Sequence, residues 1–124
     1  IYGGGGKQTK PENKTVYICE GAINAETIGE NGIATGGKSI SRYQVNKFIK
    51  SPVEKFVILI DPDAKDKALN LAFKLVPFKK VKVVFLPDNE DVNSLGKRKT
   101  LEYVRKTTYQ TYQELLTIKS ELKL

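Results

Sequence analysis

The sequence has 124 residues, of which 40% are hydrophobic, so it is long enough for one domain with a core and too short for two. One cysteine, Cys19, and no histidine exclude a disulfide framework or a Cys/His zinc site within the chain, and we expect Cys19 to be a small buried strand residue. The net charge of +7 favours polyanionic partners, although a lysine-rich solvated surface is the simpler alternative.

The first half of the chain alternates predicted strands and helices. Residues 1–14 contain four consecutive glycines followed by lysines and are expected to be a flexible lead-in. A helix that extends to about residue 50 can be capped by Ser39 or Ser41. The other elements expected here are strands at 15–19 and 33–35 and a short helix at 23–30 that is stopped by Asn31-Gly32.

The strongest strand signal is the run from Phe56 to Ile60, in which every residue is apolar and four of the five are β-branched or aromatic. Such a run is typical of a strand that is buried on both faces of a parallel sheet. A helix over about 64–76 and a strand over 81–86 follow. The repeated alternation predicts an α/β fold with an approximately four-stranded, mainly parallel sheet flanked by helices.

A helical tail is predicted at the C-terminal end, over residues 107–124. It places Tyr109, Tyr112, Leu116 and Ile118 on one stripe. Core packing is the simplest explanation of this stripe, and a docking face for further domains of a longer protein is the alternative. No apolar run approaches the roughly 18 residues that a membrane helix needs, and no secretory signal is visible. We therefore expect a cytoplasmic protein without a membrane partner.

Acidic residues follow three of the predicted strands. Glu20 ends the first strand, Asp61 and Asp63 end the central one, and residues 88–91 bring further carboxylates after the fourth. The carboxyl ends of parallel strands share the sheet edge at which ligands bind. Because Mg²⁺ takes oxygen ligands, this layout predicts a divalent-metal site for phosphate chemistry. Gly21, directly after Glu20, is expected to permit a tight turn and close backbone approach.

Residues 32–39 match the phosphate-binding pattern G-x-x-x-x-G-K-[ST] letter for letter. That loop requires a strand ending just before its first glycine, whereas residues 24–31 are predicted to be helical. We therefore do not interpret this segment as a nucleotide-binding P-loop. Lys38 is still a candidate phosphate ligand, because it precedes the N-terminus of a predicted helix.

Four segments resemble, in order and spacing, the Toprim domain that topoisomerases and primases share. The resemblance covers about residues 15–106 and rests on Val16–Gly21, Ala34–Gly37, Ile58–Asp63 and Phe85–Asp91. The last segment, Leu-Pro-Asp-x-x-Asp, points to bacterial- and phage-type DNA primases. The Arg-Glu-Gly-Glu sequence of Toprim topoisomerases is absent, and Asp66-Lys67 stands where the ribosomal-RNA maturase branch has a Gly-Glu-like turn.

The resemblance implies that Glu20, Asp61 and Asp63 are catalytic metal-site residues, with Asp91 as a further acidic ligand for Mg²⁺ or Mn²⁺. The implied activity is the synthesis of RNA primers from NTPs on single-stranded DNA. A parent protein of phage or mobile-element type would also contact a replicative helicase. The basic residues expected to hold triphosphate or template backbone are Lys38, Lys65, Lys67, Lys97, Arg98 and Lys99.

Three residues depart from the family's pattern. Asn24 and Asn93 stand where the family usually has Asp, which weakens the expectation of a second metal, and Asp66 replaces a glycine. Because the sequence begins at Ile1 and lacks Met, we expect a fragment of a longer polypeptide that is inactive alone. The alternatives are a Toprim nuclease or topoisomerase fragment, and a non-catalytic module that only binds nucleic acid or partner proteins.

Overall fold

The computed structural model describes residues 15–35, 40–59 and 61–124. The predicted flexible lead-in and Lys38 therefore lie outside the described residues. The division of the chain at residue 106 into a Toprim domain and a C-terminal helix stays a prediction. Within the described part of the chain, no helix is both long and apolar enough to cross a lipid bilayer.

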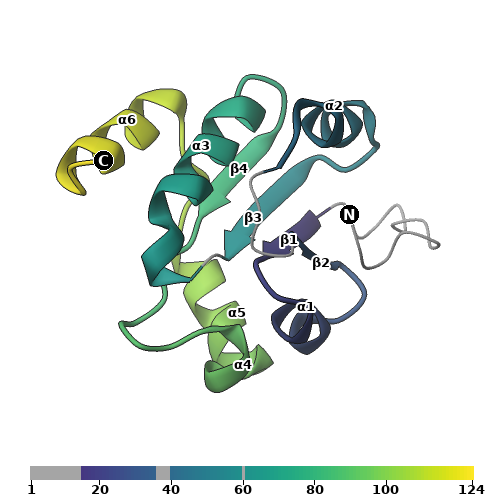
Figure 1. The fold of residues 1–124 in the computed structure, drawn as a ribbon, viewed down its shortest axis with the longest axis vertical. Coiled ribbons are helices and arrows are strands. Elements are labelled where there is room, and N and C mark those ends of the chain that lie inside the picture. The colour runs from purple at the N-terminus through teal and green to yellow at the C-terminus, as the bar shows by residue number, and fades with distance from the viewer. Residues whose placement is uncertain (1–14, 36–39, 60) are drawn as a thin grey trace.

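A four-stranded sheet forms the middle of the molecule, with all neighbouring strands parallel and in the order β2-β1-β3-β4 (Figure 1). Cys19 pairs with both Ala34 and Leu59, so β1, β2 and β3 end level with one another. The predicted α/β class with a four-stranded parallel sheet is thus confirmed. The strands are β1 (Thr15–Cys19), β2 (Gly32–Ala34), β3 (Lys55–Leu59) and β4 (Lys80–Val83).

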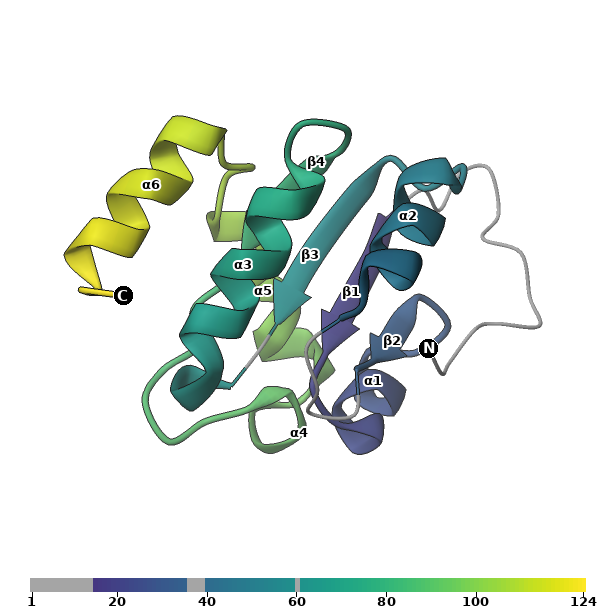
Figure 2. The same ribbon diagram turned by 45° about the horizontal axis from the view of Figure 1, so that its top comes forward.

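Helices cover both faces of the sheet (Figures 1 and 2). One face is packed by α2 and α3, with α6 beside α3, and the other by α1, α4 and α5. The helices are α1 (Ala22–Ile28), α2 (Arg42–Lys50), the 3-10 turn η1 (Pro62–Ala64), α3 (Lys65–Leu75), α4 (Val92–Leu95), α5 (Lys97–Lys106) and α6 (Tyr112–Glu121).

Strand β3 is buried on both of its faces, which explains its uninterrupted apolar sequence. Phe56 and Ile58 enter the core beneath α2 and α3, whereas Val57 and Leu59 enter the core beneath α1, α4 and α5. All four side chains are at most 1% exposed. Successive side chains of a strand point to opposite faces, so one run of apolar residues supplies two cores.

The residues that begin α2 and end α1 can be compared with the predicted helix caps and stops. Ser41 begins α2, because its Oγ accepts a hydrogen bond from Gln44 N at 3.2 Å while Gln44 Oε1 accepts one from Ser41 N at 3.3 Å. The predicted stop of α1 at Asn31-Gly32 is wrong. The helix ends at Ile28, and Gly29 follows with φ 110°, a conformation that glycine adopts readily.

Gly32 belongs to β2, where the strand passes close to α1. A Cβ atom at this position would lie 2.3 Å from the backbone oxygen of Ala25, so only glycine fits without movement of one backbone. The second strand therefore begins one residue earlier than predicted. This glycine, the first of the P-loop-like pattern, is required for packing, and it opens a strand instead of following one.

The predicted apolar stripe of the C-terminal helix is only partly correct: Ile118 packs against the core, but Tyr112 and Leu116 do not enter it. Thr111 caps α6, since its Oγ1 accepts a hydrogen bond from Glu114 N at 3.1 Å, and Tyr109 precedes the helix. Tyr112 and Leu116 are exposed. Leu115 is fully buried in the core. The start of the helix at Tyr112 determines that this side of α6 faces the core.

The segment between α5 and α6 covers the outer edge of β4. Gln110 N donates to Val81 O at 2.9 Å, and the Gln110 side chain accepts from Val83 N at 2.8 Å and donates to Val83 O at 3.2 Å. The amide group thus takes the place of a neighbouring strand. β4 ends at Val83, although Val84 N still donates to Ile58 O at 3.0 Å, so the strand begins one residue earlier and ends sooner than the strand predicted over residues 81–86.

Lys82 is buried within β4, with 6% of its surface exposed. Its Nζ donates to the backbone oxygens of Val104 and Thr107, both at 2.7 Å, at the C-terminal end of α5. Burial, and then the charge of Lys55, lower the pKa of the Lys82 ammonium group. The backbone oxygens compensate for part of this cost, because the C-terminal end of a helix favours a cation.

Candidate metal centre

Three carboxylates meet at the carboxyl edge of the sheet. Glu20 follows β1, Asp61 follows β3, and Asp63 lies in the 3-10 turn η1. Since β1 and β3 are neighbours and end at the same level, their following residues emerge together. One oxygen from each of the three groups lies within 4.8 Å of the others. Glu20 and Asp61 are half-buried and Asp63 is exposed.

Burial and mutual repulsion govern the protonation of this cluster. The pKa of Glu20 is raised, first by burial and then by its hydrogen bond to Asp61 and by the charges of Asp61 and Asp63. Lys67 lowers it, and is therefore close enough to act on the cluster. The pKa of Asp61 is also raised, chiefly by burial. The hydrogen bond between the two groups raises the pKa of Glu20 and lowers that of Asp61, so Glu20 is the group that donates to Asp61 when it is protonated.

Asp91 lies near the cluster and also has a structural role. Its Oδ1 accepts a hydrogen bond from Ser94 N at 2.8 Å, and its own N–H donates to Ser94 Oγ at 2.9 Å, so it caps α4. Its charge contributes to the raised pKa of Asp61. Among the described residues, the compact group of carboxylates consists of Glu20, Asp61 and Asp63 without Asp91.

Asn24 is buried, and its side chain links α1 to α4. Its Oδ1 accepts a hydrogen bond from the backbone N–H of Asn93 at 3.0 Å. The amide oxygen satisfies a donor in the first turn of α4, a turn that has few partners of its own. The Asn93 side chain is exposed, with Thr27 Oγ1 at 3.4 Å from its Oδ1. Sequence reasoning missed this link, which joins residues far apart in the chain.

The predicted basic residues are divided between two places. Lys65 and Lys67 lie in the first turn of α3, directly after the carboxylates, and Lys65 Nζ is 5.9 Å from the ring centroid of Phe85. Lys97 begins α5, and its Nζ would lie 3.6 Å from a Cβ atom at Gly29. It therefore sits at the end of α1 remote from Glu20, about 10 Å along the helix. Arg98 and Lys99 follow it in the first turn of α5, where Arg98 pairs with Glu102 at 3.5 Å.

Two neighbours of Glu20 have different environments. Cys19 is fully buried, and burial followed by the charge of Asp61 raises the pKa of its thiol to about 12, so it is a structural residue as predicted. Gly21 is extended, with φ −106° and ψ 155°, and a Cβ atom there would meet nothing within 4 Å. The chain bends at Glu20 and Gly21 between β1 and α1, whereas the predicted close backbone approach at Gly21 is wrong. Open space lies beside it.

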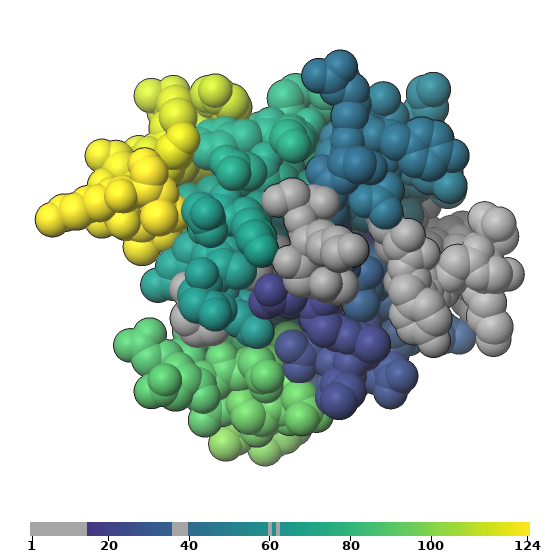
Figure 3. Space-filling view, in the orientation of Figure 1, coloured from purple at the N-terminus to yellow at the C-terminus, as the bar shows by residue number. Residues whose placement is uncertain are grey.

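The surroundings of the carboxylates are formed by three helices. Figure 3 shows the purple region that contains α1 beside the green region that contains α4, and the two helices are in contact. Glu20 leads into α1, Asp63 leads into α3, and Asp91 leads into α4. The arrangement offers a half-buried group of oxygen atoms with lysines at one side, which suits a divalent cation that contacts phosphate.

No protein-family model matches the chain, and no curated protein is significantly similar to it in sequence. Solved structures of primases do match it. A DNA primase domain from Pseudomonas aeruginosa is 18% identical, with 82% of this chain and 37% of that chain covered and a TM-score of 0.67. The Aquifex aeolicus primase, represented by its zinc-binding and RNA polymerase domains, is 23% identical, with coverages of 89% and 30% and a TM-score of 0.68.

A third match is the catalytic domain of DnaG primase bound to single-stranded DNA, with 17% identity, coverages of 86% and 38% and a TM-score of 0.68. The fold is that of the Toprim domain in DNA primases. This agrees with the resemblance found in the sequence. The Toprim fold described here spans between 30% and 38% of the length of these three primase structures.

Proposed function

We propose that this chain is the Toprim domain of a DNA primase and that Glu20, Asp61 and Asp63 hold a divalent cation, Mg²⁺ or Mn²⁺. The reaction is nucleotidyl transfer from NTPs, which makes RNA primers on single-stranded DNA. One observation carries the proposal: three carboxylates gather within 4.8 Å at the carboxyl edge of a sheet that has the fold of primase catalytic domains.

The donor set fits a hard divalent cation. Carboxylate oxygens are the ligands that Mg²⁺ and Mn²⁺ prefer. Without a cation, burial and the neighbouring charges oppose ionisation of Glu20 and Asp61, so a positive charge among them would be stabilising. When bound, such an ion lowers the pKa of a primer 3′-hydroxyl and neutralises charge on the phosphates.

The side chains around the cluster have separable roles in this proposal. With the aspartates holding a cation, Glu20 in its ionised form would serve as a further ligand or as a general base for a reacting hydroxyl. Lys65 and Lys67 bind the triphosphate beside the carboxylates. Asp91 has a second carboxylate oxygen, beyond the one that caps α4, with which to serve as a further ligand.

The template is expected to contact basic residues farther from the cluster. Lys97, Arg98 and Lys99 lie at the N-terminal end of α5, whose dipole adds to their positive charge. Lys38 stays a candidate from the sequence. The complex of DnaG primase with single-stranded DNA supports binding of such a template by this fold. A replicative helicase is the further partner that the resemblance to primases implies.

The metal site is tested by titrating the chain with Mg²⁺ and Mn²⁺ while amide NMR shifts are followed. We expect saturable shifts at Glu20, Asp61 and Asp63 that vanish in the Asp61→Asn/Asp63→Asn variant. The matched control is Glu26→Gln/Glu30→Gln, which removes two exposed charges from α1 and the turn after it and should leave the titration unchanged. Absence of site-specific shifts at millimolar metal contradicts the metal-dependent proposal for this chain.

A second candidate is a Toprim module that binds nucleic acid without catalysis, as the two Asn residues suggest. For Asn24 this argument is weaker, because its amide oxygen accepts a hydrogen bond that links α1 to α4 and so has a structural role. Glu20→Gln in the longer protein separates the candidates: a primase, or a Toprim nuclease or topoisomerase, loses its activity. A pure binding module keeps its affinity for nucleic acid.

A further inference from the structure

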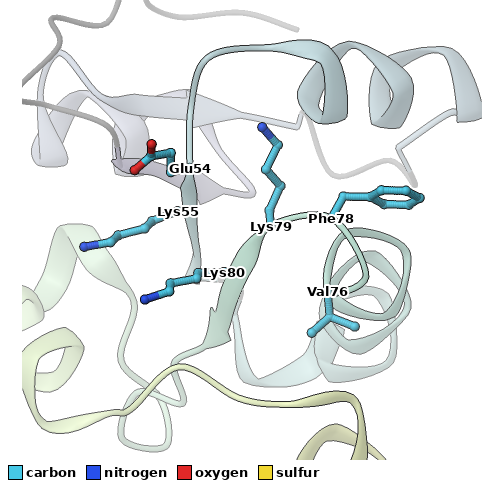
Figure 4. Close-up of a pocket in the computed structure, with 6 residues that line it drawn as sticks. All are labelled: Glu54, Lys55, Val76, Phe78, Lys79 and Lys80. Atoms are coloured by element: carbon cyan, nitrogen blue, oxygen red, sulfur yellow. The ribbon is translucent and has the colours of Figure 1, made fainter.

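A second group of lysines lies at the opposite, amino-terminal edge of the sheet. Lys55 begins β3 and Lys80 begins β4, and the register places them directly opposite each other. Neighbouring parallel strands are about 4.8 Å apart, and like charges in directly opposed positions destabilise a sheet. Figure 4 shows both side chains extending in the same direction from the two strands. The fold thus tolerates a local repulsion that an anion would relieve.

Lys82 extends this group along the same face of β4. It is two residues beyond Lys80, and strand residues two apart share a face. The Lys55 charge contributes to the lowered pKa of Lys82, which shows that the two ammonium groups interact. The ring of Tyr109 lies against both, with its centroid 4.4 Å from Lys82 Nζ and 5.9 Å from Lys55 Nζ.

Two hollows open beside these lysines and share the residues between them. The first has a volume of about 410 Å³ and is lined by Glu54, Lys55, Val76, Phe78, Lys79 and Lys80 (Figure 4). The second, of about 550 Å³, is also bordered by Lys79 and Lys80 and continues to Tyr109 and Tyr112. Together they form one continuous surface in which Glu54 is the single acidic group among the described lining residues.

Aromatic rings flank the lysines at both ends of this surface. Phe78 is 62% exposed, on the side of the first hollow away from Lys55 and Lys80, and Tyr112 is 53% exposed in the second hollow (Figure 4). Nucleic-acid bases stack on such rings, and proteins that bind single strands combine aromatic platforms with a basic groove. An acidic polypeptide would satisfy the lysines but would gain little from the rings.

We propose that Lys55, Phe78, Lys80 and Tyr112, the amino-edge surface, bind a single-stranded nucleic acid. Lys79 between them is structural, because its Nζ donates to the backbone oxygens of Ser51 at 2.9 Å and Val53 at 2.6 Å. A phosphate lies between Lys55 and Lys80, and unstacked bases contact Phe78 and Tyr112. This surface is at the end of the sheet remote from the carboxylates, so its binding requires no divalent cation. It is independent of the proposed function, and either proposal can fail while the other stands.

The test measures binding of a fluorescein-labelled oligothymidylate to the whole chain by anisotropy, in EDTA and over a range of salt concentrations. Lys55→Gln/Lys80→Gln should weaken binding about tenfold or more near 0.1 M salt. It should also flatten the slope of log K against log salt by about 1.4, since each single-strand phosphate contact contributes about 0.7. The matched control, Lys47→Gln/Lys50→Gln on exposed positions of α2, should change binding less than twofold.

Phe78→Ala tests the contribution of stacking, because loss of one base–ring contact weakens binding by roughly fivefold or more without a change in salt slope. Asp61→Asn/Asp63→Asn, which removes the metal site, should bind the oligonucleotide at least as tightly as the wild type. If Lys55→Gln/Lys80→Gln fails to fold by circular dichroism, Lys80→Gln alone, at an exposed position, should flatten the slope by about 0.7.

Two results overturn the proposal. In the first, the α2 control weakens binding as much as the change at Lys55 and Lys80, which would mean that only net charge matters. In the second, polyglutamate of equal length competes as well as unlabelled oligothymidylate and Phe78→Ala changes nothing, which assigns the surface to an acidic polypeptide instead.

Discussion

Folding buries the carboxyl groups of Glu20 and Asp61 and so disfavours their ionised forms, whereas metal binding requires those ionised forms. Both carboxyl groups have raised pKa values in the folded chain, chiefly because of burial. The folded state therefore binds more protons than the unfolded state at pH values above the ordinary pKa values of 4.5 and 3.8. The stability that the protonated pair contributes is fully present below those values and is lost as the pH rises through the folded-state pKa values.

Glu20→Gln mimics the protonated group and should remove part of this pH dependence. In EDTA, we expect the variant to unfold at a higher temperature than the wild type at pH 7.5 and at nearly the same temperature at pH 4. Thermal unfolding by circular dichroism measures both. Glu26→Gln, at an exposed position of α1, is the control and should show no such difference between the two pH values. Equal behaviour of the two variants would contradict the raised pKa of Glu20.

Metal affinity should vary with pH in the opposite direction. Since a cation binds the ionised forms of Glu20 and Asp61, affinity for Mg²⁺ or Mn²⁺ increases as the pH rises through their folded-state pKa values. The raised pKa values thus lower the apparent metal affinity at acidic pH, and a titration with Mn²⁺ at pH 5 and at pH 7.5 measures the difference.

At the level of elements, the Asn24 side chain joins α1 to α4 and so positions the segment that carries Asp91. The first-turn N–H of Asn93 depends on the Asn24 oxygen. Because α4 has only four residues, it has little helical stability of its own and relies on its cap and on this link. An acid at position 24 could accept the same hydrogen bond, so the amide keeps the link while adding no charge near the metal centre.

Asn24→Ala should lower the free energy of unfolding by about 1–3 kcal/mol, because the Asn93 N–H loses its acceptor in a partly buried place. Asn24→Asp should stay within about 1 kcal/mol of the wild type, since the acceptor is kept and charge strengthens it. Urea unfolding followed by circular dichroism measures both. Asn46→Ala, on the exposed side of α2, is the control and should change stability by less than about 0.5 kcal/mol.

Asn24→Asp should also tighten Mg²⁺ or Mn²⁺ binding, as an added negative charge attracts the cation. An Asn24→Ala variant as stable as the wild type would show that the α1–α4 link contributes nothing, and α4 would then be held by its capping residues alone.

At the level of the whole molecule, the C-terminal segment completes the core. Leu115 of α6 is fully buried against the face of α3, whereas its neighbour Leu116 is 40% exposed. Gln110 pairs with β4, and Lys82 binds the backbone of Thr107. Residues after 106 are thus packed with the sheet and helices that precede them.

Leu115→Ala should destabilise the fold by about 2–5 kcal/mol through lost burial and the cavity that remains. Leu116→Ala, one position along the same helix, should cost less than about 0.5 kcal/mol. Denaturant unfolding distinguishes the two. The reverse order of effects would restore the stripe of Tyr112 and Leu116 that the sequence predicts and would contradict the structure of α6.

The sheet and the carboxylate cluster could be predicted from the sequence because both depend on local signals. The apolar run of β3 identifies a central strand, and parallel neighbours bring the following residues, Glu20 and Asp61, to one edge. The Thr111-x-x-Glu114 capping box also indicates where α6 begins, but the apolar spacing of Tyr112 and Leu116 favours a different buried face.

Other features depend on contacts that the sequence does not express. The hydrogen bond between Asn24 and Asn93 joins positions 69 residues apart, and no local sequence pattern predicts it. Lys82 alternates with apolar residues as an exposed strand residue would. It is buried because the end of α5 supplies two backbone oxygens for its ammonium group. Such tertiary partners override the ordinary preference of a lysine for solvent.

The buried position of Leu115 also bears on the order in which a growing chain can fold. During synthesis, β1, β3 and α3 have emerged well before residue 115, so the part of α3 that packs against α6 stays exposed until α6 is made. A nascent chain at that stage has a nearly complete sheet and an exposed hydrophobic surface on α3. Chaperones bind surfaces of this kind, which also promote aggregation. Slow translation between residues 80 and 115 would prolong this vulnerable interval.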